Sequence, residues 1–266
     1  MIILFGNKKG GVGKSITAIN LAGAIISKAK RRGTLTKTTV CIVDADTNES
    51  VVNYIRRRET YSQELVKQGL EELPFIKCEL RKPDDTLTRD LKALDELYDY
   101  VLVDTGGYEN RAFKSSVPVS DMIYLPFQPS QVDLEQLIPT LFVIKQIEEN
   151  VQDGVNPDFK VDPRLLLTMV DHTSRDLFQE AKRVCVQLLS YASISGVAIP
   201  QVKAIKKIQD KGLTLSDSIA GSGEYKYTAH AKRAQFDLLL DEIDGIREVE
   251  YKRETQMVSD TSDTTC

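Results

Sequence analysis

The sequence predicts an α/β protein with a mostly parallel, twisted sheet and helices on both faces. Short apolar runs with β-forming residues alternate along the chain with segments long enough to form helices. Several of these runs are continuously apolar, which is typical of strands covered on both sides. A glycine-rich loop directly follows the first run and opens a helix, which places a loop with special backbone geometry at one edge of the sheet.

The elements follow one another in regular alternation. Strands are expected at Ile2–Phe5, Thr39–Val43, Tyr100–Val103, Met122–Pro126, Leu165–Val170 and Val197–Ile199. Helices are expected from Ser15 to about Lys30, and at Thr86–Tyr98, Val132–Ile147 and Asp176–Leu189. Two segments, Glu109–Ser120 and Gly221–Tyr227, are predicted to be loops. No linker or internal repeat divides the chain, so residues 1–255 are predicted to form a single domain, followed by a disordered polar tail at 256–266.

The composition excludes several classes of protein. The chain has 266 residues, of which 41% are hydrophobic and 28% charged, so it can bury a core without disulfides or a structural metal. The uncharged run Ile16–Ser27 is too short to span a bilayer, and the first residues lack the basic region of a signal peptide. A cytoplasmic protein is therefore expected.

The four cysteines are far apart, and the chain has two histidines, His172 and His230. This spacing argues against a zinc site, an iron–sulfur centre and a redox dithiol. A catalytic Cys–His pair stays open, although cysteines are more often small buried apolar residues.

The most informative segment is residues 6–15, with the sequence GNKKGGVGKS. Its glycines allow the backbone to wrap around a phosphate, and the helix that follows adds the positive end of its dipole. Lys14 is expected to reach the β- and γ-phosphates, and Ser15 to bind Mg²⁺. The first glycine of the G-x-x-x-x-G-K-[ST] pattern is replaced by Lys8, whereas the deviant pattern K-G-G-x-G-K-[ST] fits throughout. A glycine-rich turn that binds nothing is the alternative.

Acidic residues end two of the predicted strands. Asp44 and Asp46 follow the second strand, at the edge where parallel sheets bind ligands, and point the same way if the strand continues. Alternatively, they only cap the next helix. Asp104 ends an apolar strand in the manner of a Walker B motif and can accept a hydrogen bond from Ser15 or from a Mg²⁺-bound water. Gly107 is expected to bring a backbone N–H near the γ-phosphate.

These motifs resemble those of the ParA/MinD group of deviant Walker ATPases, over residues 1 to about 245. The segment from Val40 to Ser50 is similar to the group's V-x-x-x-D-x-D-P-Q-x-S switch, with departures at Thr47 and Asn48. Further similar stretches are Tyr98–Gly107, Tyr124–Asp133, Leu167–Asp171, and Ile199–Pro200 with Gly212. The resemblance implies a P-loop NTPase fold.

The resemblance also implies roles for individual residues. Lys9 would reach the nucleotide of the other subunit in a dimer, and Asp46 would hold the Mg²⁺-bound and attacking waters. The expected catalytic residues are therefore Lys9, Lys14 and Asp46, and the expected Mg²⁺ residues are Ser15, Asp46 and Asp104. The expected nucleotide-binding residues are Lys9, Gly10, Gly11, Val12, Gly13, Lys14, Ser15, Ile16, Asp104 and Gly107.

In function, the resemblance implies a weak ATPase that uses ATP and Mg²⁺ and segregates DNA. Such a protein forms a homodimer with ATP, binds DNA non-specifically, and is released when a centromere-binding, ParB-like adaptor stimulates hydrolysis. Because the first strand starts at residue 2, the short form without an N-terminal helix-turn-helix is expected, located in the cytoplasm and on the nucleoid if bacterial. The alternative is a MinD-like spatial regulator or a cargo-positioning ATPase that does not act on DNA. The acidic, polar end of the chain lacks the apolar stripe of a membrane helix, so no membrane binding is expected.

The charge distribution is compatible with DNA binding. The net charge is −4, but eight acidic and three basic residues from Asp241 onward account for −5, so the rest sums to +1. Four lysines recur at helical spacing and form a candidate DNA-binding face: Lys203, Lys206, Lys207 and Lys211. Arg56, Arg57 and Arg58 form a separate basic run. Each set is equally compatible with a solvated helix face.

Overall fold

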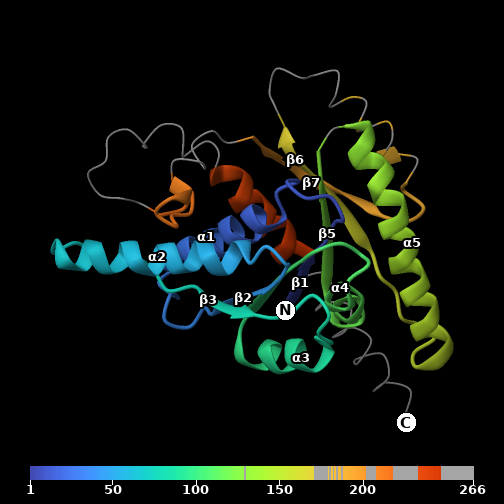
Figure 1. Ribbon diagram of the computed structural model, residues 1–266, viewed down its shortest axis with the longest axis horizontal. Coiled ribbons are helices and arrows are strands. Elements are labelled where there is room, and N and C mark those ends of the chain that lie inside the picture. The colour runs from blue at the N-terminus through green and yellow to red at the C-terminus, as the bar shows by residue number, and fades with distance from the viewer. Residues whose placement is uncertain are drawn as a thin grey trace, which may run out of the picture.

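The computed structural model describes residues 1–128, 130–170, 179, 181, 183, 185–186, 188–201, 208–217 and 233–246. Within them, one seven-stranded sheet has the order β3-β2-β4-β1-β5-β6-β7 (Figure 1). Every neighbouring pair of strands is parallel. The predicted α/β class and parallel sheet are confirmed.

The six predicted strands are present, most of them longer than expected. The strands are β1 (Ile2–Phe5), β2 (Val40–Ala45), β3 (Lys77–Leu80), β4 (Tyr100–Thr105), β5 (Met122–Phe127), β6 (Pro163–Val170) and β7 (Ser193–Pro200). The strand β3 was not predicted. It is a half-buried edge strand of sequence KCEL, which lacks the apolar run of a central strand.

Helices connect the strands. They are α1 (Lys14–Arg32), α2 (Ser50–Lys67), α3 (Thr88–Leu97), α4 (Arg111–Ser116) and α5 (Gln131–Gly154), with a 3₁₀ turn, η1, at Val117–Val119. A further helix covers residues 233–246. In the predicted helix Asp176–Leu189, the described residues 179, 181, 183, 185 and 186 are helical. The predicted loop Gly221–Tyr227 and the tail at 256–266 lie outside the described residues, so the single domain at 1–255 stays a prediction.

The predicted loop Glu109–Ser120 is wrong, because it contains α4 and η1. The reason is a contact that no local pattern reveals. Phe113 is fully buried against the start of the loop after β1, where a Cβ on Gly6 would lie 2.2 Å from the Phe113 ring. Ala112 and Val117 are also fully buried, so this short amphipathic segment is stabilised by tertiary packing.

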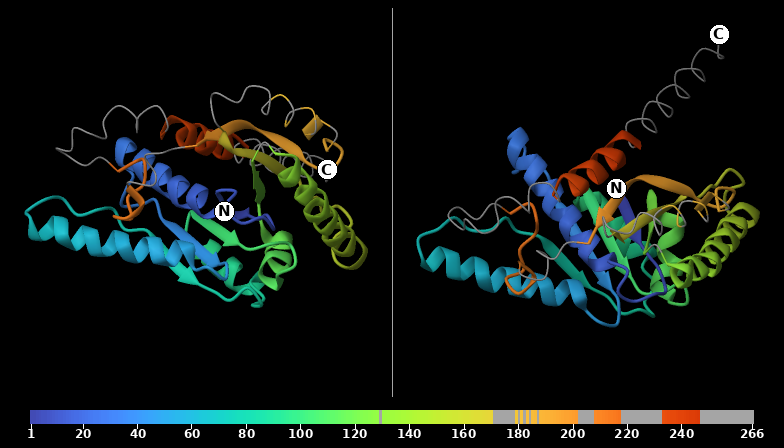
Figure 2. Two further views of the ribbon diagram at one scale, coloured as in Figure 1. Left: turned by 45° about the horizontal axis from the view of Figure 1, so that its top comes forward. Right: turned by 90° about the horizontal axis from the view of Figure 1, so that it is seen from above.

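Two hydrophobic cores lie on the two faces of the sheet. One is formed with α1, α2 and the helix at 233–246, and the other with α3, α4 and α5. Figure 2 shows the 233–246 helix in red beside α1 in blue, and Lys28 of α1 makes ion pairs of 2.7 Å with both Asp241 and Asp244. In the described part of the chain, no helix is both long and apolar enough to cross a membrane. The carboxyl ends of β1, β2 and β4 meet at one edge, and the candidate site lies there.

Candidate nucleotide-binding site

The loop between β1 and α1 has a backbone that only glycine adopts readily. Gly11 and Gly13 have φ angles of 77° and 89°, in the left-handed region. Side chains from the neighbouring strand ends hold the same loop: Gln128 Nε2 donates to the Gly11 carbonyl at 3.0 Å, and Thr168 Oγ1 donates to the Val12 carbonyl at 2.6 Å. The loop shape is therefore set by its glycines and by β5 and β6 together.

The start of α1 is suited to binding an anion. Its N-cap, Gly13, has no side-chain cap, and the first turn contains no acidic residue, so the first N–H groups lack a side-chain acceptor. Lys14 is only 6% exposed, and its Nζ donates to the Lys9 carbonyl at 3.3 Å. A buried ammonium group without a charged hydrogen-bond partner favours an anion beside it.

The Asp104 carboxylate is the most unusual group of the site. It is fully buried at the end of β4, and neither oxygen has a hydrogen-bond partner. Burial raises its pKa to about 7, while the nearby Ser15 hydroxyl and Lys14 ammonium act in the opposite direction. Such a carboxylate is costly unless a cation or a cation-bound water completes its surroundings. Oxygen ligands of this kind are those that Mg²⁺ prefers, so Ser15 and Asp104 fit a magnesium site.

The two aspartates at the end of β2 behave differently. Asp44 is fully buried and its Oδ2 accepts hydrogen bonds from the backbone N–H groups of Val51 and Val52 at 2.9 and 3.0 Å, so it caps the first turn of α2. Burial raises its pKa, and these hydrogen bonds oppose that. The strand ends at Ala45, and Asp46 is half-buried beyond it. The capping interpretation therefore holds for Asp44, whereas Asp46 takes no part in capping α2.

The segment after β4 rests directly on the phosphate loop. A Cβ on Gly107 would lie 2.9 Å from the Cα of Lys8, so only glycine allows this approach. Lys8 Nζ also makes a 2.7 Å ion pair with Glu109 and lies 5.5 Å from the centre of the Tyr108 ring. The structure thus brings Gly107 beside the loop, and its contact with a γ-phosphate remains a prediction.

Lys9 is paired within its own chain. Its Nζ lies 2.6 Å from Oδ2 of Asp133, a fully buried carboxylate in the first turn of α5. Ser130 caps the same helix and hydrogen-bonds to the same carboxylate. The S-x-x-D spacing is that of a capping box and indicates a helix start, but nothing in the sequence links Asp133 to Lys9. The predicted role of Lys9 in a second subunit requires that this pair opens.

The predicted DNA-binding lysines are mostly outside the described residues, namely Lys203, Lys206 and Lys207. Lys211 is described and exposed. In the run Arg56–Arg58, Arg58 is buried and makes two hydrogen bonds with Asp217 at 2.6 and 2.9 Å. This run therefore provides two basic side chains at the surface, not three.

The described cysteines are unsuited to catalysis. Burial raises the pKa of the Cys41 and Cys78 thiols to about 12 and that of Cys185 to about 11, so all three stay protonated near neutral pH. Both histidines lie outside the described residues.

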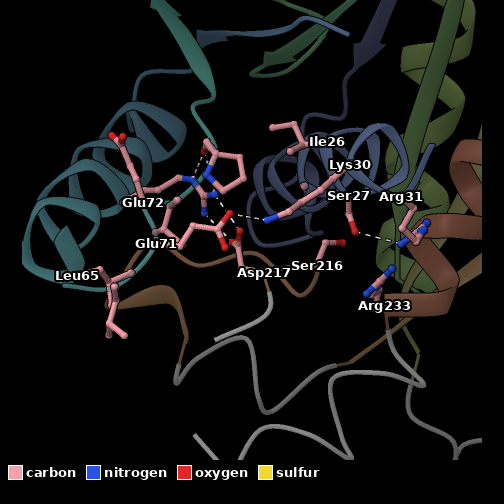
Figure 3. A pocket seen from close by; sticks show the side chains of 15 residues that line it. Ile26, Ser27, Lys30, Arg31, Leu65, Glu71, Glu72, Ser216, Asp217 and Arg233 are labelled. Carbon is pink, nitrogen blue, oxygen red and sulfur yellow. Dashed lines mark hydrogen bonds and ion pairs between the residues drawn. The ribbon is translucent and has the colours of Figure 1, made fainter. Parts of the chain in front are cut away.

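A cavity of about 390 Å³ lies between the later parts of α1 and α2 and the segment 208–217 (Figure 3). Its charged lining is largely paired: Lys30 contacts Glu71 at 2.7 Å, and Arg58 contacts Asp217 at 2.6 Å. Gly23, the lining residue of α1 that is nearest to the phosphate loop in sequence, is nine residues after Lys14, so the cavity begins about 13 Å along the helix from the loop. It is separate from the nucleotide-binding site.

Comparisons with known proteins point to the same class of protein as this site. The family model of "ATPase MipZ" matches residues 1–146. The chromosome partitioning protein ParA of Myxococcus xanthus is 29% identical over 206 residues, covering 69% of this chain and 70% of that protein. The maintenance of carboxysome distribution protein A of Gloeobacter kilaueensis is 32% identical over 180 residues, covering 66% and 67%.

A solved structure shows the same fold. It is that of a putative plasmid partition protein from Borrelia burgdorferi bound to AMPPNP, with a TM-score of 0.58 and 17% identity, covering 91% of this chain and 98% of that one. The phosphate loop, the buried Walker B carboxylate and the matched family model lead to one conclusion. This chain belongs to the MipZ/ParA family of P-loop ATPases.

Proposed function

We propose that this protein is a DNA-partition ATPase. It binds ATP and Mg²⁺, forms a homodimer with ATP, binds DNA without sequence preference, and leaves DNA after hydrolysis stimulated by a ParB-like adaptor. The observation that carries the ATPase part is the unpartnered, buried Asp104 carboxylate beside Ser15 and Lys14. The names of two similar proteins, a chromosome ParA and a plasmid partition protein, support the partition part.

Each site residue has a proposed role. Lys14 and the free N–H groups of α1 bind the phosphates, which replace the missing anionic partner of the buried ammonium. Ser15 and Asp104 hold Mg²⁺, which, when bound, neutralises charge on the phosphate oxygens. Asp46 orients the attacking water, because it lies at the strand end beside Asp104 without capping α2. Lys9, once free of Asp133, adds a second cation for the charge that develops in phosphoryl transfer.

The second candidate is an ATPase that positions a protein cargo. It is favoured by one observation: the carboxysome-distribution relative is 32% identical, slightly more than the partition protein at 29%. The two candidates share the ATPase chemistry and differ in what the ATP-bound dimer carries.

The test combines a substitution at Asp46 with DNA binding. Fluorescence anisotropy with a random-sequence duplex is measured with ATP and with ADP, alongside phosphate release. We expect the wild type to bind DNA with ATP only, and Asp46→Ala to bind ATP and DNA without releasing phosphate. Asp84→Ala, at an exposed aspartate before α3, is the matched control and should behave as the wild type.

Two results would refute parts of the proposal independently. Phosphate release by Asp46→Ala at the wild-type rate would remove Asp46 from the mechanism. An ATP-bound wild type that ignores DNA at low salt would refute the partition function, and cargo positioning without DNA would take its place.

A further inference from the structure

The middle of α2 and the turn at 208–212 lie against each other. A Cβ on Gly212 would lie 2.2 Å from the backbone nitrogen of Arg58, so the two backbones are in direct contact. Tyr54 of α2 also donates its hydroxyl to the Leu213 carbonyl at 2.6 Å. Figures 1 and 2 both show the 208–217 segment, in orange, beside α2. Residues about 150 apart in sequence thus share one surface.

Two basic side chains are fixed on this surface by aromatic rings of α2. The Arg57 guanidinium lies 5.4 Å from the centre of the Tyr54 ring, and its Nε donates to the Gln209 carbonyl at 3.1 Å. Lys211 Nζ lies 4.9 Å from the centre of the Tyr61 ring. Tyr54 and Tyr61 are two helical turns apart and therefore lie on the same side of α2. The rings hold both cations at the seam between α2 and the turn.

A third cation lies next to Arg57 in sequence. Arg56 is exposed, about 100° around α2 from Arg57, and among the described residues its guanidinium hydrogen-bonds to the Asn53 side chain at 3.4 Å. In the described part of the chain, none of Arg56, Arg57 and Lys211 forms an ion pair with a carboxylate. By contrast, Lys8, Lys28, Lys30 and Arg31 are all paired with acids. The exposed acids nearest in sequence are Glu59 and Asp210.

We propose that Arg57 of α2 and Lys211, with Arg56 next to Arg57 on the outer face of α2, bind the sugar-phosphate backbone of double-stranded DNA. The proposal rests on the proposed function and extends it to α2, whose basic run the sequence alone sets apart from the lysines at 203–211. Unpaired cations bind phosphates without losing an existing ion pair. Because they contact only the backbone, they contribute affinity and no sequence preference.

The test uses charge-removing variants that spare the contacts between α2 and the turn. Arg56→Gln and Lys211→Gln, singly and together, leave Arg57 and its bond to Gln209 in place. For ATP-bound protein on random-sequence duplex, the slope of log affinity against log salt should fall by about 0.9 for each phosphate that the variant no longer binds. The double variant should therefore show a slope smaller by about 1.8 per protomer. Glu59→Lys should raise the affinity at a given salt concentration.

The matched control removes the same charge from the opposite face of the sheet. Arg89→Gln/Lys92→Gln changes two exposed cations of α3, and its salt slope should equal that of the wild type. Circular dichroism and the thermal unfolding midpoint confirm that each variant folds.

The outcomes separate the surface from the function. If wild-type protein with ATP binds DNA and Arg56→Gln keeps the full slope, the α2 surface is refuted while the function stands. An equal decrease of the slope in the α3 control would also refute it, since net charge alone would then explain the effect. If the Arg56→Gln/Lys211→Gln variant loses binding to anionic phosphatidylglycerol vesicles while its DNA binding is unchanged, the surface binds lipid and the proposal is overturned. Absence of DNA binding by the wild type would refute the proposed function itself.

Discussion

Replacing Asp104 by asparagine should stabilise the nucleotide-free protein and, under the proposed function, abolish Mg²⁺-dependent ATP hydrolysis. The carboxylate is fully buried, and its pKa is raised to about 7 because burial disfavours the charged form. In the unfolded chain an aspartate has a pKa of about 3.9. The folded state therefore holds the proton more tightly than the unfolded state. It follows that ionisation of Asp104 opposes folding.

The sign and size follow from the two pKa values. Because the folded-state pKa is the higher one, stability is greatest below about pH 4 and falls as the pH rises to about 7. Each unit of pKa difference corresponds to about 1.4 kcal/mol, so the penalty is about 1 to 2 kcal/mol at pH 5 and about 4 kcal/mol at pH 8. Asp104→Asn lacks the titration, so its stability relative to the wild type should rise by about 2 to 3 kcal/mol between these pH values.

Urea unfolding at pH 5 and pH 8, without nucleotide or Mg²⁺, measures this difference. Other titrating groups are common to both proteins and cancel, and the unpartnered asparagine amide adds a cost that does not depend on pH. A difference in stability that is the same at both pH values would refute the reasoning. Addition of Mg²⁺ and ATP should then stabilise the wild type more than the variant, because only the wild type gains a cation at its carboxylate.

Three further substitutions test the phosphate loop and its ion pair with α5. Lys14→Ala should lose ATP binding in a fluorescent-nucleotide titration, because the buried cation of the site is gone, while Lys37→Ala at an exposed lysine should bind as the wild type does. Lys9→Ala should bind ATP but fail to dimerise in light scattering, and Asp133→Asn should dimerise at lower ATP concentrations because Lys9 is already free; a Lys9→Ala dimer as stable as the wild-type dimer would make Lys9 an ordinary surface lysine.

Those parts of the site that depend on local geometry could be predicted from the sequence. The glycines of the phosphate loop require left-handed backbone angles, and Gly11 and Gly13 adopt them. Asp44 and Asp104 end neighbouring parallel strands, and they are directly paired in the sheet. Both features follow from rules that act within a few residues or on all parallel sheets.

Contacts between distant segments have no such local signal. The pairing of Lys9 with Asp133 joins residues 124 apart, and the bond from Arg57 to the Gln209 carbonyl joins residues 152 apart. The helix α4 is stabilised by the packing of Phe113 beside Gly6. Its short sequence carries no local helix signal and therefore resembles a loop. Asp44 and Asp46 look equivalent in sequence, but the strand ends at Ala45 and only Asp44 caps α2.

The pairing of Lys9 connects the phosphate loop to α5 and makes its release costly. If Lys9 leaves, the fully buried Asp133 carboxylate keeps one hydrogen bond, from the Ser130 hydroxyl, but loses its cation, and its Oδ1 already lacks a partner. A buried charge without a counter-ion is strongly unfavourable. Thermal motion alone should therefore rarely free Lys9, and an anion near the loop must compete for it. If Lys9 serves a second chain as proposed, bound ATP would supply such an anion, and the ion pair with Asp133 would make the availability of Lys9 to that chain depend on nucleotide.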